Sequence, residues 1–267
     1  MKTNSTYKIA VLTDLSSSAD QTLKSAVNLS KLLNGHIDLY YAKSSNGIAK
    51  FENQMSSLRA LNEAYTDTKI QLSELAKRMS KTEGVNINYT FSVGQVKREI
   101  KDYLTQTQPD IVVLGKKKQK LVNGFGDGIT KFVLKHHKGG VMISSPYNMM
   151  EQDLTLGMVN TNLELLNTPL AKHLTTMSSS PLKSFVIGNQ KSTSSKSEHN
   201  VETIEYVFED GPNSIKTVSN YVNKNNIKLL YMEKAKALGK GIRSLTPDFN
   251  TMISKINAPI LVLGERH

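Results

Sequence analysis

The residues best suited to chemistry are one carboxylate and one loop rich in lysine and glycine. Asp14 follows an apolar run directly, and the loop begins after Gly115, at the end of another apolar run. The loop holds Lys116, Lys117, Lys118, Lys120, Gly124, Gly126 and Gly128. Glycines let backbone N–H groups approach phosphate oxygens, and lysines add positive charge. This combination indicates an anion-binding role for the loop.

The sequence offers no arrangement for metal or hydrolytic catalysis. It contains no cysteine, and its six histidines are scattered except for His136 and His137. Adjacent residues on a helix point to different sides, so this pair does not form a metal-binding face. A Gly-x-Ser-x-Gly motif, a zinc-type spacing and a Walker loop are all missing from the sequence. We therefore expect a protein that is not an enzyme.

The charge of the chain is concentrated in its first part. Residues 1–150 hold 21 Lys/Arg against 12 Asp/Glu, whereas residues 151–267 hold 13 against 11, within a total of +11. A basic region attracts phosphate-bearing partners, although a solvated lysine-rich surface explains the same numbers. Nucleic acid is a weaker alternative, because the chain has no tryptophan and only 6% aromatic residues to stack on bases.

The same composition favours a cytoplasmic protein without a membrane partner. The start of the chain has no signal-peptide pattern, and no apolar run approaches the roughly 20 residues that cross a bilayer. The absence of cysteine suits a reducing compartment.

The elements that would position Asp14 and the loop alternate between strand and helix. The predicted strands of the first part are Ile9–Thr13, Ile37–Ala42, Val85–Val93, Asp110–Leu114 and Val141–Ser144. Strands joined by crossover helices lie parallel, with helices on both faces of the sheet. Ligands bind such sheets at the carboxyl ends of the strands, where Asp14 and the loop lie.

The clearest helix has apolar residues at alternating steps of three and four. Its stripe comprises Leu58, Leu61, Tyr65, Thr68, Leu72, Leu75 and Met79. This spacing predicts a helix that packs on the sheet, because three heptads are short for a coiled coil.

The second part of the chain repeats the order of the first. Its strand-like runs are Leu154–Val159, Phe185–Gly188, Val201–Phe208, Ile227–Met232 and Pro259–Leu263. From Gly115 to Gly140 is 25 positions, and from Glu233 to Pro259 is 26. Such a repeat predicts two domains, at 1–148 and 149–267. The polar segment 189–200 stands where the first domain has its long helix, so we expect the second domain to be smaller.

Several of these segments resemble the universal stress protein family. The resemblance rests on Ile9–Asp14, Val93-Gly94, Pro109–Gly115 and Ile129–His136. It implies an α/β fold of two tandem five-stranded parallel sheets, of the adenine nucleotide alpha hydrolase-like type. It also implies that the last strands pair, either between the two domains or in a homodimer. Family members act in stress survival, and some bind ATP.

The family's nucleotide signature is damaged in this sequence. Its form is Gly, two residues, Gly, nine residues, then Gly and Ser/Thr. Gly115 is in place, but Lys118 replaces the second glycine. Counted forward, the closing pair is Gly128-Ile129 and lacks a hydroxyl; counted backward from Ile129-Thr130, it is Asp127-Gly128.

The resemblance still assigns roles to matching positions, with ATP as the cofactor of the first domain. Asp14 would lie near the adenosine and the backbone of Ala42 near the base, although Asp14 could equally be a turn carboxylate. The remaining residues would surround the phosphates: Gly115, Lys116, Lys118, Gly126, Gly128 and Thr130. In the second domain Glu233 and Lys236 replace the two glycines, and Asn160 stands for Asp14.

These observations favour a tandem stress-response module that regulates or binds other molecules without catalysis, and whose nucleotide site is degenerate. Two alternatives remain open. The first domain could be a true ATP-binding site, or the basic surface could bind polyanions.

Overall fold

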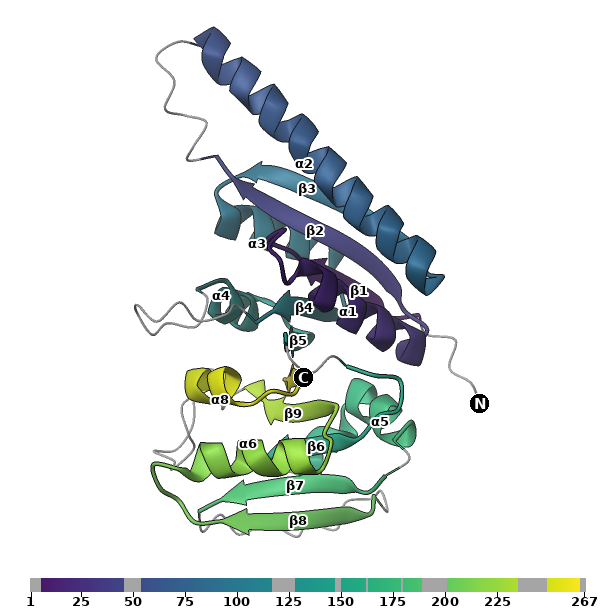
Figure 1. Ribbon diagram of the computed structural model, residues 1–267, viewed down its shortest axis with the longest axis vertical. Helices are drawn as coiled ribbons and strands as arrows, with labels where there is room; N and C mark the ends of the chain where they lie inside the picture. Colours follow the sequence, from purple (N-terminus) through teal and green to yellow (C-terminus); the bar gives the residue numbers. More distant parts are fainter. Residues whose placement is uncertain are drawn as a thin grey trace.

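One sheet of ten strands runs through the whole molecule (Figure 1). The computed structural model describes residues 6–45, 54–116, 128–146, 150–161, 163–178, 180–188, 201–234 and 249–264. The strand order is β3-β2-β1-β4-β5-β10-β9-β6-β7-β8. The order 3-2-1-4-5 therefore recurs as 8-7-6-9-10, in the reverse direction across the sheet. We call residues 6–146 the first half and residues 150–264 the second half.

The first half alternates strand and helix as the sequence predicts. Its elements are β1 (Lys8–Leu12), α1 (Ala19–Leu33), β2 (His36–Ser44), α2 (Gln54–Glu83), β3 (Ile87–Gly94), α3 (Val96–Thr107), β4 (Ile111–Gly115), α4 (Gly128–His136) and β5 (Gly140–Ser144). All strand pairs within this half are parallel. Helix α1 ends where Asn34 adopts a left-handed conformation, with a φ of 50°.

The second half has shorter helices. Its described elements are β6 (Leu156–Val159), the 3-10 helix η1 (Leu163–Asn167), α5 (Pro169–Thr176), β7 (Leu182–Ile187), β8 (Thr203–Phe208), α6 (Ser214–Lys224), β9 (Leu229–Glu233), α8 (Phe249–Lys255) and β10 (Ile260–Leu263). Its strands are also mutually parallel. Thr168 caps the first turn of α5. For the second part of the chain the sequence patterns predicted strands and did not predict this helix.

The two halves meet through their last strands. β10 pairs antiparallel with β5, and the register places Leu261 opposite Met142. This pairing occurs within one chain, as the intramolecular alternative predicts. It uses the edge of each last strand, so the free edges of the sheet are β3 and β8.

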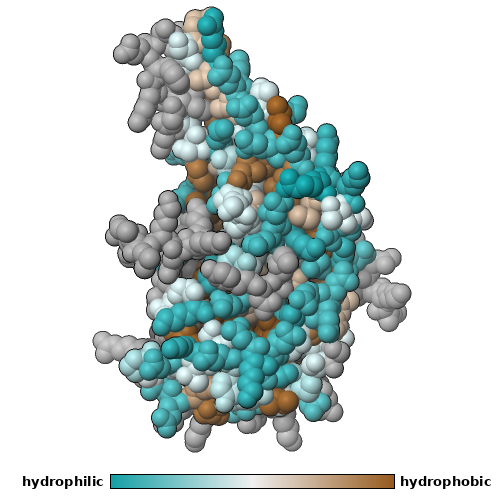
Figure 2. All heavy atoms as spheres, in the orientation of Figure 1, coloured by the Kyte–Doolittle hydropathy of each residue, from teal (hydrophilic) through white to brown (hydrophobic). Residues whose placement is uncertain are grey.

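The sheet carries one layer of helices on each face. Buried residues of α1, α2 and α5 pack on one face, and those of α3, α4, α6 and α8 pack on the other. The central strands are almost fully apolar, as is typical of strands that are covered on both sides. The visible surface in Figure 2 is mainly hydrophilic, with small separate apolar groups.

Helix α2 is longer than the sheet beneath it. Its later turns pack on the sheet, where Leu72 is fully buried. Its first turns project beyond the strands (Figure 1), and there Leu58 is 52% exposed and Tyr65 is 51% exposed. The predicted stripe is therefore a packing face along only part of its length.

Candidate functional site

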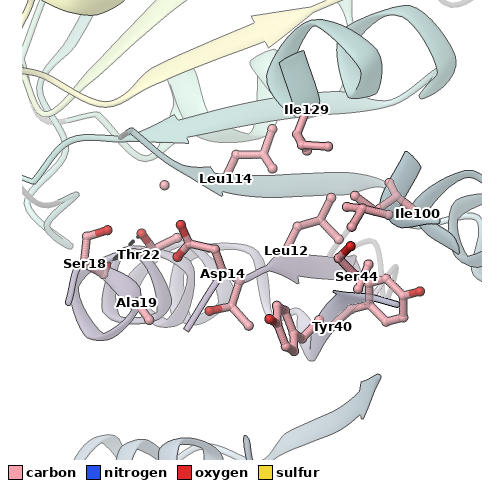
Figure 3. Close-up of a pocket in the computed structure, with 15 residues that line it drawn as sticks. Leu12, Asp14, Ser18, Ala19, Thr22, Tyr40, Ser44, Ile100, Leu114 and Ile129 are labelled. Atoms are coloured by element: carbon pink, nitrogen blue, oxygen red, sulfur yellow. Dashed lines mark hydrogen bonds between the residues drawn. The ribbon is translucent and has the colours of Figure 1, made fainter. Parts of the chain in front are cut away.

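A cavity of about 240 Å³ opens at the carboxyl ends of β1, β2 and β4. Its walls come from these strand ends, the first turn of α1, the α3 helix and the start of α4. Figure 3 shows Leu114 and Ile129 on one side, across from Leu12 and Asp14. Parallel sheets with this strand order bind ligands at this edge.

Three of the predicted site residues, Asp14, Ala42 and Gly115, line this one cavity. The rest of the wall is largely apolar, with hydroxyl groups from serine, threonine and tyrosine. Among the described lining residues, none carries a positive charge and Asp14 is the one carboxylate. This part of the wall suits a ring system and hydroxyl groups better than several phosphates.

Asp14 is positioned by a tight turn after β1. Its Oδ1 accepts a hydrogen bond from the backbone N of Ser16 at 3.0 Å. Leu15 between them has a φ of 55°, which is left-handed and unusual for a leucine. Burial and the charge of Asp14 raise the pKa of the neighbouring Tyr41. The carboxylate is thus a turn residue that also faces the cavity.

The backbone of Ala42 faces the same space. The Thr13 N–H donates to the Tyr40 carbonyl at 2.9 Å, and the β1–β2 register ends at Tyr40. Backbone groups alternate in direction along a strand, so those of Ala42 point to the same side as those of Tyr40. They lie past the end of β1, toward the cavity. A ligand with donor and acceptor groups can pair with them there.

Tyr40 lines the cavity and is hydrogen-bonded to α3. Its hydroxyl donates to the Glu99 carbonyl at 3.1 Å and lies 2.6 Å from the Ser92 hydroxyl. Its ring stacks on that of Tyr103, with centroids 3.9 Å apart. Burial raises the pKa of Tyr40, and the bond to Ser92 offsets part of this effect. No motif in the sequence distinguishes this residue, which lies inside a predicted strand.

Gly115 has a steric role independent of any ligand. A Cβ atom at this position would lie 2.6 Å from Thr22 Oγ1. That oxygen donates to the Ser18 carbonyl and accepts from the Ser144 hydroxyl. The absence of a side chain therefore lets the first turn of α1 rest on the end of β4.

The start of α4 supplies an apolar side chain where a hydroxyl was expected. Ile129 lines the cavity, whereas Thr130 is buried and is not among the lining residues. Gly128 begins the helix, and among the described residues a Cβ there would meet the end of the Lys97 side chain, with Nζ at 3.7 Å. The two counts of the loop differ at Asp127, which lies outside the described residues. Lys118 and Gly126, two further predicted site residues, lie outside the described residues.

Lys116 is directed away from the cavity. Its ammonium donates to the carbonyls of Ser254 at 3.0 Å and Ile256 at 3.3 Å, both in the second half. Burial lowers the pKa of this lysine. The predicted role of Lys116 at the phosphates would require it to leave these partners.

A comparison with protein families gives the family of the chain. A model of the universal stress protein family matches residues 6–144, which include β1 to β5 and all the described residues that line the cavity. The chain belongs to the universal stress protein family. A search of curated proteins found no match.

Solved structures of other universal stress proteins share the architecture. One from Archaeoglobus fulgidus DSM 4304 superposes with a TM-score of 0.70 at 12% identity, over 96% of this chain and 98% of that one. A putative universal stress protein from Pseudomonas aeruginosa UCBPP-PA14 has a TM-score of 0.53 at 10% identity, over 97% and 94%. At these identities the likeness extends to the fold alone. A further structure, a universal stress protein in complex with cAMP, has a TM-score of 0.40 at 20% identity, over 52% and 97%.

In the second half of this universal stress protein, the end of β6 corresponds to the end of β1, and Asn160 lies there. The Asn160 N–H donates to the Phe185 carbonyl, as Thr13 does to Tyr40. Asn160 therefore corresponds to Thr13, and our alignment of Asn160 with Asp14 is wrong by one residue. Thr161 is the counterpart of Asp14.

The Asn160 side chain closes the space that is open in the first half. Its Oδ1 accepts from the Ile187 N–H at 2.7 Å, and the residue is 5% exposed. Ile187 follows Phe185 by two positions, as Ala42 follows Tyr40. The backbone group that faces the cavity in the first half is therefore paired internally in the second. Glu233 stands in place of Gly115, as the sequence indicates.

The described residues were compared with the requirements for a metal site and for a membrane-spanning helix. No group of three or more His, Asp or Glu residues there could hold a metal ion. None of the described helices has the length and hydropathy needed to cross a bilayer.

Proposed function

We propose that this universal stress protein is a non-catalytic regulatory or interaction module of the stress response. The first half keeps a ligand cavity with a degenerate nucleotide site, and the second half is its structural partner. The contrast between Ala42 and Ile187 carries this proposal. The Ala42 backbone points into a cavity, whereas the Ile187 N–H is held by Asn160.

The chemistry of the described wall supports the absence of catalysis and of tight triphosphate binding. The ionisable lining residues are Asp14, Tyr40 and Tyr41, without a histidine or lysine to serve as a base or cation at neutral pH. A carboxylate near a triphosphate is repulsive. Lys116, which directly follows the lining residue Gly115, is held by the second half.

The test is whether adenine nucleotide accompanies the protein. We expect mass spectrometry of the denatured, purified protein to find no stoichiometric adenine nucleotide. Mg-ATP should also leave the unfolding temperature unchanged. A ligand at 100 times its Kd would add about 2.7 kcal/mol, which for a chain of this size is a rise of roughly 5 °C or more.

The second candidate is an ATP-binding protein that uses the first half. It is favoured by the meeting of Asp14, Ala42 and Gly115 at one cavity. Co-purified ATP would establish it, and Asp14→Ala should then reduce the bound fraction. Thr161→Ala is the matched control, because it changes the equivalent position of the second half.

A further inference from the structure

Two lysines occupy equivalent positions in the two halves. Lys116 follows β4 directly and Lys234 follows β9 directly. Their side chains cross the β5–β10 pair in opposite directions. Lys116 Nζ donates to the carbonyls of Ser254 and Ile256, where α8 ends. Lys234 Nζ donates to the carbonyl of His137, where α4 ends.

The acceptors explain why a lysine is suited to each position. The last carbonyls of a helix lack partners within the helix and carry a partial negative charge. An ammonium group donates hydrogen bonds to these carbonyls, and its positive charge is attracted to their partial negative charge. Burial lowers the pKa of both lysines, so neither is an ordinary surface charge. Both contacts join helix ends in one half to a strand end in the other.

The strand pair between them is short. Its register contains the pairs Ile260–Ile143, Leu261–Met142 and Val262–Val141. A slip by two residues would keep every side chain on its own face of the sheet, so the apolar pattern alone opposes it weakly. The same slip would move each ammonium about 7 Å along the strand from its carbonyls.

We propose that Lys116 and Lys234 form a reciprocal latch that fixes the register of the β5–β10 pair and unites the two halves. Each half thereby stabilises the last helix of the other. This inference goes beyond the proposed function, because it requires no ligand. It also accounts for the direction of Lys116, which leaves the cavity although its neighbour Gly115 lines it.

The experiment compares Lys116→Met, Lys234→Met and the double variant with the full chain. Methionine keeps the long apolar stem and removes the charge. The control is Lys135→Met, an exposed lysine on α4. Thermal unfolding and hydrogen exchange read by mass spectrometry are measured without ligand.

We expect each single variant to lower the unfolding temperature by about 3 °C or more. Exchange should rise roughly tenfold in β5 and β10 of both single variants, and at the helix end that each lysine contacts. The loss in the double variant should differ from the sum of the single losses, because both lysines act on one junction. The control should match the wild type.

Additive losses with unchanged exchange in β5 and β10 would mean two independent helix caps and would overturn the latch. An unchanged unfolding temperature in both single variants would overturn it as well. Should Lys116→Met fail to fold, Lys234→Met carries the same test, because its effect on β5 and β10 distinguishes a junction from a local cap.

Discussion

Gly115 shows how one atom decides the distance between a helix and a strand. A methyl group at this position would lie 2.6 Å from Thr22 Oγ1. That oxygen is hydrogen-bonded to Ser18 and Ser144. The first turn of α1 would have to move, and α1 carries part of the cavity wall. The glycine is therefore needed for packing, whatever the cavity binds.

We predict that Gly115→Ala lowers the free energy of unfolding by about 1–3 kcal/mol, as expected for an overpacked site. Gly128→Ala should change it by less than about 1 kcal/mol, because among the described residues the added Cβ meets a flexible lysine end at 3.7 Å. Urea denaturation of both variants measures the difference. Equal losses would show that the contact with Thr22 is not the cause.

Two structural features favour an asparagine at position 160. Its Oδ1 accepts from the buried Ile187 N–H, and its φ of 44° is left-handed, a conformation that asparagine tolerates better than alanine. We predict that Asn160→Ala costs about 2–4 kcal/mol of unfolding free energy, since it leaves a buried N–H unpaired and strains the backbone.

Thr161→Ala serves as the control for this prediction. Thr161 is the neighbour of Asn160, is only partly buried, and its hydroxyl bonds to the Val159 carbonyl within the same turn. Its loss should stay below about 1 kcal/mol. A small loss in Asn160→Ala as well, measured by the same denaturation, would mean that the side chain is not needed to close this position.

At the scale of elements, α2 divides into a packed part and a projecting part. The division falls near Lys43, whose ammonium bonds to Thr68 Oγ1 at 2.9 Å and to the Ala64 carbonyl at 3.2 Å. Between these two contacts Tyr65 packs on the Phe91 ring, with centroids 4.6 Å apart. Earlier in the helix, Leu58 is half exposed.

We predict that two leucines of one stripe differ in their contribution to stability. Leu72→Ala should cost about 2–4 kcal/mol, because Leu72 is fully buried where α2 packs on the sheet. Leu58→Ala should cost less than about 1 kcal/mol, because that side chain is 52% exposed. Chemical denaturation of the two variants tests this, and similar losses would contradict the projection of the first turns.

The periodic stripe predicts that α2 is a helix, but it cannot predict how much of the helix is covered. Coverage depends on where β2 and β3 end beneath it, which is a property of the sheet. The same limit applies to the site. Asp14, Ala42 and Gly115 come together because parallel strand ends share one edge, and the sequence order reveals this.

Other features of the site depend on contacts that no local pattern contains. The partner of Lys116 lies 138 positions away, across a strand pair between the halves. The equivalence of Asn160 with Thr13 is visible only in the hydrogen bonds to the neighbouring strand, because an alignment without them is uncertain by one residue. Long-range register is thus the information that the sequence alone lacked.

At the scale of the whole molecule, the β5–β10 pair makes one continuous sheet from two similar halves. Leu261 of β10 is fully buried and lies opposite Met142 of β5. Its neighbours in the core belong to both halves. The folding of the two halves should therefore be coupled, and the chain should unfold in a single transition.

We predict that Leu261→Lys separates the unfolding of the two halves. A lysine buried at this position without a partner weakens the junction by about 3 kcal/mol or more, and the second half, which holds β10, should melt first. Scanning calorimetry should then show two transitions in place of one. Ile204→Lys is the control, because Ile204 lies on the edge strand β8 and is 41% exposed, far from the junction in strand order. A single transition in Leu261→Lys, as cooperative as that of the control, would mean that the halves are joined by something other than their last strands.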